Sequence, residues 1–168
     1  MNRTQAELDA VRASGVVLPG KWAALWCGDY ELADEILAPD FRMHFAASVP
    51  GADTACGPGE FVAFVLKPWR RVRPGVVVTL EDVPMVDGED DLVSIRWLTT
   101  HDADPAGKSG IDQLKLRHHR ISRAWSVSGP RAFRNSVAKS VTAAHCRRSD
   151  GSFVATSVRT WSGHFVQS

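Results

Sequence analysis

Residues 92–127, LVSIRWLTTHDADPAGKSGIDQLKLRHHRISRAWSV, decide the fold. Apolar and polar residues alternate in three runs, which predicts strands over 92–100, 111–117 and 121–127. A Gly- and Pro-containing loop over 101–110 joins the first two runs, and a short turn joins the last two. Because both connections are short, we expect an antiparallel meander.

The chain before this stretch predicts mostly helices. Apolar spacing, capping residues and proline positions indicate helices at 4–13, 21–27, 30–37 and 58–69, and strands at 41–46 and 76–83. Gly15 and the Pro19-Gly20 pair predict a break between the first two helices. Helices that precede a meander indicate an α+β fold with the helices on one face of the sheet.

Composition excludes several classes of protein. The chain has 168 residues, 44% of them hydrophobic, and a formal net charge of +1, which is typical of one water-soluble domain and not of a nucleic-acid binder. No run approaches the ~20 apolar residues that span a bilayer. The polar start, MNRTQAELDAVR, lacks a signal-peptide core, so we expect a cytoplasmic protein without membrane association. Its three cysteines form no Cys-x-x-Cys motif.

The charge is divided unevenly along the chain. Residues 131–168 carry a net charge of +5 and contain no Leu, Ile or Glu, whereas residues 1–130 carry −4. We therefore divide the chain into a helical lead-in at 1–20, a core domain at 21–130 and a basic Ser/Thr-rich extension. The extension either adds one strand, at 153–161, or is loosely ordered.

Five fragments together resemble a known family. They are WAALWCGDYELADEILAPDF (22–41), GPGEFVAFV (57–65), SIRWLTTH (94–101), GIDQLKL (110–116) and RISRAWSV (120–127). Their order and spacing resemble the SnoaL-like polyketide cyclases of the nuclear transport factor two-like superfamily. The resemblance covers roughly residues 20–130 and implies a cone-shaped α+β fold, with N-terminal helices packed on a curved mixed or antiparallel sheet. It also implies a homodimer formed through the open sheet face.

The chain departs from the family pattern in its last predicted strand. The family often has Glu-His-Trp there, whereas this chain has Arg123-Ala124-Trp125. The resemblance therefore implies the fold, whereas the type of reaction stays open between cyclisation, isomerisation, dehydration and epoxide opening.

Asp112 is the first candidate catalytic residue. Strand alternation places it on the same face as Leu114 and Leu116, and burial of a carboxylate among apolar side chains raises its pKa toward the range useful for proton transfer. In the resembled cyclases an Asp at this position is the general acid/base. The alternative is that Asp112 begins its strand and caps a turn in water.

Two histidines are further candidates. His101 matches a family Thr-His segment and would polarise a substrate carbonyl or share a proton with Asp112. His44 matches a family His near the pocket mouth. The alternatives are a solvent-exposed loop histidine and a hydrogen-bonded structural one, respectively. We expect no metal site, because no further ligand stands at a fixed spacing from His101.

Large apolar residues are expected to line a pocket or to fill the core. The candidates for substrate binding are Trp97, Phe64, Trp26, Trp125 and Leu114. Arg70, Arg71 and Arg73 follow the helix predicted at 58–69. They either grip an anionic ligand or RNA, or are cations favoured by a helix C-terminus.

These observations and the resemblance lead to one functional hypothesis. It is a cofactor-independent enzyme that acts on a small apolar, polyketide- or terpenoid-like substrate by cyclisation, isomerisation, dehydration or epoxide opening. Natural-product biosynthesis is the setting that the resemblance implies. The alternative is a non-catalytic ligand-binding or dimerisation module of the same fold.

Overall fold

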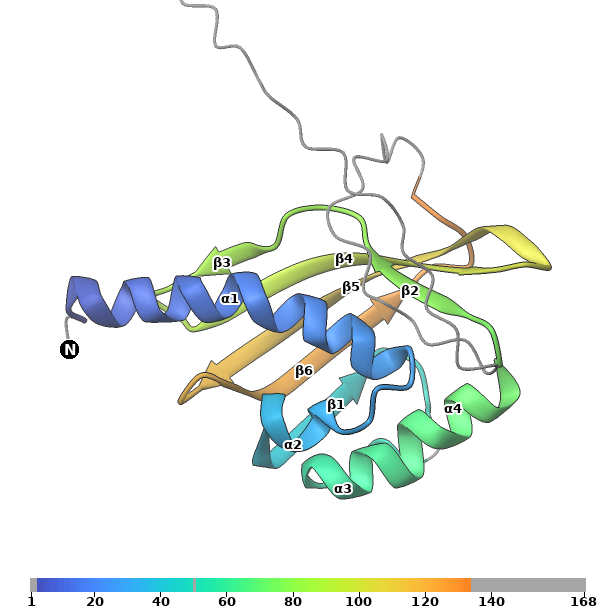
Figure 1. Ribbon diagram of the computed structural model, residues 1–168, viewed down its shortest axis with the longest axis horizontal. Coiled ribbons are helices and arrows are strands. Elements are labelled where there is room, and N and C mark those ends of the chain that lie inside the picture. Colours follow the sequence, from blue (N-terminus) through green and yellow to red (C-terminus); the bar gives the residue numbers. More distant parts are fainter. Residues whose placement is uncertain (1–2, 50, 134–168) are drawn as a thin grey trace, which may run out of the picture.

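The computed structural model describes residues 3–49 and 51–133, which form helices packed on one mixed sheet (Figure 1). The helices are α1 (Gln5–Trp26), α2 (Leu32–Ile36), α3 (Gly57–Phe61), the π-helical turn η1 (Val62–Leu66) and α4 (Lys67–Val72). The strands are β1 (Leu37–Phe45), β2 (Val77–Leu80), β3 (Met85–Asp87), β4 (Leu92–His101), β5 (Asp104–Arg117) and β6 (Arg120–Ser128). The predicted α+β class is confirmed.

The sheet has the strand order β1-β6-β5-β4-β2, with β3 also paired to β4. Strands β4, β5 and β6 form the predicted antiparallel meander, whereas β1 pairs in parallel with β6. The loop predicted over 101–110 is largely strand, because β5 begins at Asp104 and pairs with the end of β4.

The predicted break in the first helical region is wrong. Helix α1 runs without interruption from Gln5 to Trp26, with Pro19 inside it, so it also crosses the predicted boundary at residue 20. Gly15 packs tightly against Val86 of β3, since a Cβ at Gly15 would lie 2.6 Å from a Val86 methyl group. The contact of the helix with the sheet outweighs the low helix propensity of Gly and Pro.

The helical segment at 57–72 is also continuous, but it changes its winding. Five residues of η1 separate α3 from α4, and Pro68 is the second residue of α4. Proline has no N–H to donate to the carbonyl four residues earlier, and wider turns are one way in which a helix accommodates this loss. Gly57 starts the segment at φ +78°, close to the carbonyl of Pro39 in β1.

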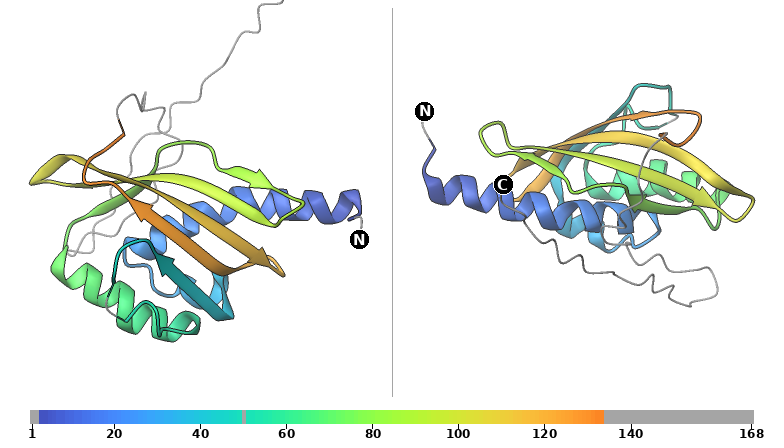
Figure 2. Two further views of the ribbon diagram at one scale, coloured as in Figure 1. Left: turned by 180° about the vertical axis from the view of Figure 1, so that it is seen from behind. Right: turned by 90° about the horizontal axis from the view of Figure 1, so that it is seen from above.

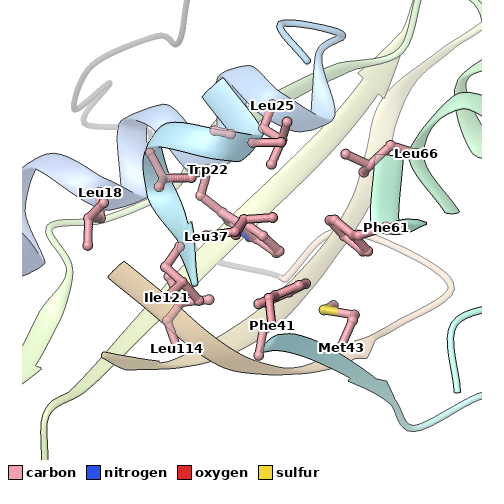
Figure 3. Close-up of a cluster of buried hydrophobic side chains, with 14 of the residues drawn as sticks. Leu18, Trp22, Leu25, Leu37, Phe41, Met43, Phe61, Leu66, Leu114 and Ile121 are labelled. Atoms are coloured by element: carbon pink, nitrogen blue, oxygen red, sulfur yellow. The ribbon is translucent and has the colours of Figure 1, made fainter. Parts of the chain in front are cut away.

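All helices lie on one face of the sheet, and the core lies between the helices and that face (Figure 2). Trp22 of α1, Phe41 of β1 and Phe61 of α3 are buried and in mutual ring contact, and aliphatic side chains of β5 and β6 close the cluster from the sheet side (Figure 3). The opposite face of the sheet, here called the outer face, is not covered by a helix in the described part of the chain.

Residues 131–133 continue from β6 along the edge of β5, where Ser109 donates its N–H to the carbonyl of Arg131. The rest of the predicted basic extension, including the candidate strand at 153–161, lies outside the described residues. In the described part of the chain, no helix has the length and apolar character needed to cross a bilayer.

Candidate active site

A pocket of about 730 Å³ lies between the helices and the inner face of the sheet. Its wall is mostly apolar and includes four tryptophans: Trp22, Trp26, Trp69 and Trp97. Among the described residues that line it, only Asp112 and Arg73 are charged. The volume lies within the usual range for small-molecule sites.

Asp112 lies deep in this pocket, in the middle of the sheet. It is flanked by Ile95 of β4 and Ser126 of β6, and only 3% of its surface is exposed. One carboxylate oxygen accepts a hydrogen bond from the indole N–H of Trp22, and the other accepts from the indole N–H of Trp97, both at 2.8 Å. The carboxylate is therefore oriented from two sides.

The environment of Asp112 alters its acidity. Burial raises the pKa of the Asp112 carboxyl above its usual range, and hydrogen bonds from Ser126 and the two indoles oppose this rise. The net upward shift moves the pKa toward neutrality, the range in which a carboxyl group can both accept and return a proton.

Trp97 reaches Asp112 because the residue opposite it is glycine. Gly110 of β5 pairs with Trp97 of β4, and a Cβ at Gly110 would overlap the Trp97 ring. The indole therefore lies flat across the neighbouring strand, with its N–H toward Asp112 two residues further along β5. The N–H is the only polar group of an indole, and in both Trp22 and Trp97 it donates to the carboxylate of Asp112.

Trp26 and Phe64, both predicted to bind substrate, line the same pocket from the helical side. Trp26 contacts the rings of Trp22, Phe45, Phe61 and Trp69 at right angles, which fixes its orientation. Phe64 lies in the π-helical turn and is 54% exposed, so it stands at the mouth of the pocket. Such turns are frequent at functional sites.

The other candidates lie away from Asp112. His101 ends β4, where one ring nitrogen pairs with the carbonyl of Pro74 and the other accepts from the N–H of Ala103. The His44 ring stacks on Trp125 with centroids 5.7 Å apart; both residues are exposed, and neither lines the pocket. Leu114 is fully buried in the core and is also absent from the lining.

Several partners of Asp112 are not evident from sequence reasoning. Trp22 is 90 residues away, and Ser126 is one of many serines. Gly110 does have a signal, because a glycine that faces a tryptophan across an antiparallel pair leaves room for the larger ring. The described residues contain no group of three or more His, Cys, Asp or Glu side chains arranged to hold a metal ion.

Comparison with solved structures agrees with this architecture. A putative isomerase of the SnoaL-like family from Agrobacterium tumefaciens str. C58 matches with a TM-score of 0.60 and 15% identity, over 70% of this chain and 98% of that one. A putative polyketide cyclase from Bacillus cereus ATCC 10987 matches with a TM-score of 0.54 and 23% identity, over 68% and 74%. A third, a putative polyketide cyclase from Sinorhizobium meliloti, has a TM-score of 0.50 and 15% identity, over 64% and 90%.

These matches show that the chain has the SnoaL-like fold, as the resemblance predicted. No protein-family model matches the sequence, and no curated protein matches it significantly.

Proposed function

We propose that this protein is a cofactor-independent enzyme that moves a proton at carbon in a small apolar, polyketide- or terpenoid-like substrate. The observation that carries the proposal is Asp112, a carboxylate that is buried in an apolar pocket and held by two indole N–H groups. The names of the structural neighbours, a putative isomerase and two putative polyketide cyclases, support the same class of reaction.

The proposed step begins with Asp112 as a base. The hydrogen bonds from the two indoles and from Ser126 still leave a lone pair of the carboxylate free, so the group can accept a proton from a carbon next to a carbonyl. The electron pair of the broken C–H bond then forms an enolate. The protonated Asp112 returns its proton to a different atom, which completes an isomerisation, or to the new alkoxide of a ring closure.

The surroundings of Asp112 support this cycle. Trp22 and Trp97 hold the carboxylate in one orientation, so little reorganisation is needed when the proton moves. The apolar wall keeps bulk water away and sustains the raised pKa of the Asp112 carboxyl. We assign no proton-transfer role to His101 or His44, since neither side chain lines the pocket.

We also propose that two copies of the domain pair through the outer face of the sheet. Ile111 of β5 and Val127 of β6 are neighbours across the strand pair and are 39% and 52% exposed, respectively. Trp125 adds a third exposed apolar side chain to this face. Such a contiguous patch is typical of an interaction surface.

Hydrogen exchange of a simple ketone tests the proposed chemistry. With 2-tetralone in D₂O, the wild-type protein should accelerate loss of the α-proton NMR signal over buffer. Asp112→Asn should lower this acceleration by about a hundredfold or more, because the amide cannot act as a base. Asp34→Asn, which changes an exposed carboxylate on α2, is the matched control and should exchange at the wild-type rate. Exchange at the wild-type rate in Asp112→Asn would overturn the proposal.

A further inference from the structure

Arg73 is the second charged residue of the pocket wall and stands at its mouth. It follows α4 directly as its C-cap residue, its side chain is exposed, and its guanidinium lies 5.6 Å from the centre of the Trp69 ring. Because Asp112 is buried and Arg73 is exposed, the pocket has a negative group at its inner end and a positive group at its entrance.

No carboxylate neutralises Arg73 within the described part of the chain. Ion pairs join Arg96 to Asp82 and Arg117 to Asp40, but none includes Arg73. The sequence has no Asp or Glu from residue 61 to residue 80. The mouth of the pocket therefore keeps an unpaired positive charge, which attracts anions.

The attraction between a cation and a helix C-terminus explains the positions of Arg70 and Arg71 better than it explains the position of Arg73. Arg70 and Arg71 lie in the last turn of α4, where a cation stabilises the helix, and Arg70 also donates to the carbonyl of Val76. Arg73 lies beyond that turn and is the only one of the three whose side chain lines the pocket.

The two charges constrain how a ligand can lie. An anionic group near Asp112 would be repelled by the carboxylate, whereas the same group at the mouth can pair with Arg73. Between these points the wall is apolar apart from a few hydroxyl groups, which suits a hydrocarbon or aromatic body.

We infer that the pocket takes apolar molecules that carry a carboxylate at the end remote from the reacting carbon, and that Arg73 binds this carboxylate. The inference rests on the proposed function, since it names the substrate class of the same site. A guanidinium donates two parallel hydrogen bonds to a carboxylate, and the flat Trp69 ring beneath it supports this orientation.

Competition between two matched ligands tests the inference. The fluorescent probe N-phenyl-1-naphthylamine reports occupancy of the apolar pocket, and 2-naphthoate and its neutral methyl ester compete with it. For the wild-type protein, 2-naphthoate should displace the probe at about a tenfold lower concentration than the ester. Arg73→Gln should abolish this preference while the ester still competes. Arg71→Gln, an exposed arginine outside the lining, should preserve it.

The carboxylate site at Arg73 and the proposed chemistry at Asp112 can fail independently of each other. Equal competition by the acid and the ester in the wild type, or an unchanged preference in Arg73→Gln, would overturn the inference even if Asp112-dependent exchange of 2-tetralone is observed. A preference lost only in Arg73→Gln would support the carboxylate site even if no such exchange occurs. Raising the salt concentration should weaken the preference in the wild type, because the pair at the mouth is exposed.

Discussion

At Asp112, two opposing effects act on one carboxyl group. Removal from water penalises the charged form, and three hydrogen-bond donors favour it. Desolvation is the larger effect, so the folded protein holds the carboxyl proton at pH values where the unfolded chain has released it. This difference has a consequence for stability that can be measured without a substrate.

We predict that the stability difference between Asp112→Asn and the wild type depends on pH. Because folding raises the pKa of Asp112, the wild-type free energy of unfolding falls as pH rises from the unfolded pKa, about 3.9, through the folded one. The amide of the variant does not titrate, so the variant becomes more stable relative to the wild type between pH 4 and pH 8. Urea unfolding of both proteins across this range measures the difference.

Asp34→Asn provides the control for this measurement. Asp34 is exposed and belongs to none of the ion pairs among the described residues, so Asp34→Asn should change the free energy of unfolding by no more than about 0.5 kcal/mol. If the curves for Asp112→Asn and the wild type run parallel, the pKa of Asp112 is not raised by folding, and its proposed role as a base near neutral pH loses its physical support.

Sequence reasoning could identify Asp112 but not the groups that orient it. Strand alternation and the family resemblance both point to a carboxylate on the inner face. The direction of the Trp22 indole depends on how α1 crosses the sheet, which no local pattern encodes. A sequence match predicts that His101 assists catalysis, but β5 begins only three residues later, so His101 lies at the hairpin end of β4.

At the scale of secondary structure, the position of the Trp97 indole beside Asp112 depends on one residue pair between β4 and β5. Trp97 can lie across β5 only because Gly110 has no side chain, so the two residues form one unit that spans both strands. This unit explains how a bulky indole fits at the inner face while its N–H still reaches Asp112.

We predict that Gly110→Ala destabilises the wild-type protein by about 1–3 kcal/mol, because the new methyl group overlaps the Trp97 ring. In a Trp97→Ala background the same change should cost far less, since the ring that it meets is gone. Urea unfolding of the four proteins completes the cycle.

Gly20→Ala on α1 is the matched control, because its Cβ meets nothing within 4 Å, and it should be neutral or slightly stabilising. Equal costs for Gly110→Ala in both backgrounds would mean that Trp97 does not lie over Gly110. The close fit of the Trp97 ring against Gly110 would then be wrong.

Other elements show where local patterns mislead. The meander strands follow from alternation, because buried residues alternate with less buried ones along β6 and along the first part of β4. Gly15 and Pro19 look like breaks in a helix, yet α1 continues through both of them, since Gly15 lets the helix approach β3 closely. Such contacts depend on tertiary structure, so neither the composition nor the spacing of apolar residues could predict them.

At the scale of the whole domain, the helices enclose the pocket and leave the outer face of the sheet without a helical cover (Figure 2). The two faces of the sheet therefore differ in the side chains that they present. The inner face holds the carboxylate and the tryptophans, and the outer face presents Ile111, Trp125 and Val127. The pocket is built from a single chain, so the proposed dimer is not needed to complete it.

We predict that Val127→Glu dissociates the proposed homodimer. In a two-fold interface each patch meets its own copy, so the change brings two carboxylates into or near the same apolar contact. Sedimentation velocity should give a dimer for the wild type at tens of micromolar and a monomer for the variant. Val16→Glu, which alters an exposed valine on α1, should remain a dimer. A monomeric wild type, or a dimeric Val127→Glu protein, would exclude this interface. Because Val127 does not line the pocket, the monomer should still exchange 2-tetralone, which separates assembly from chemistry.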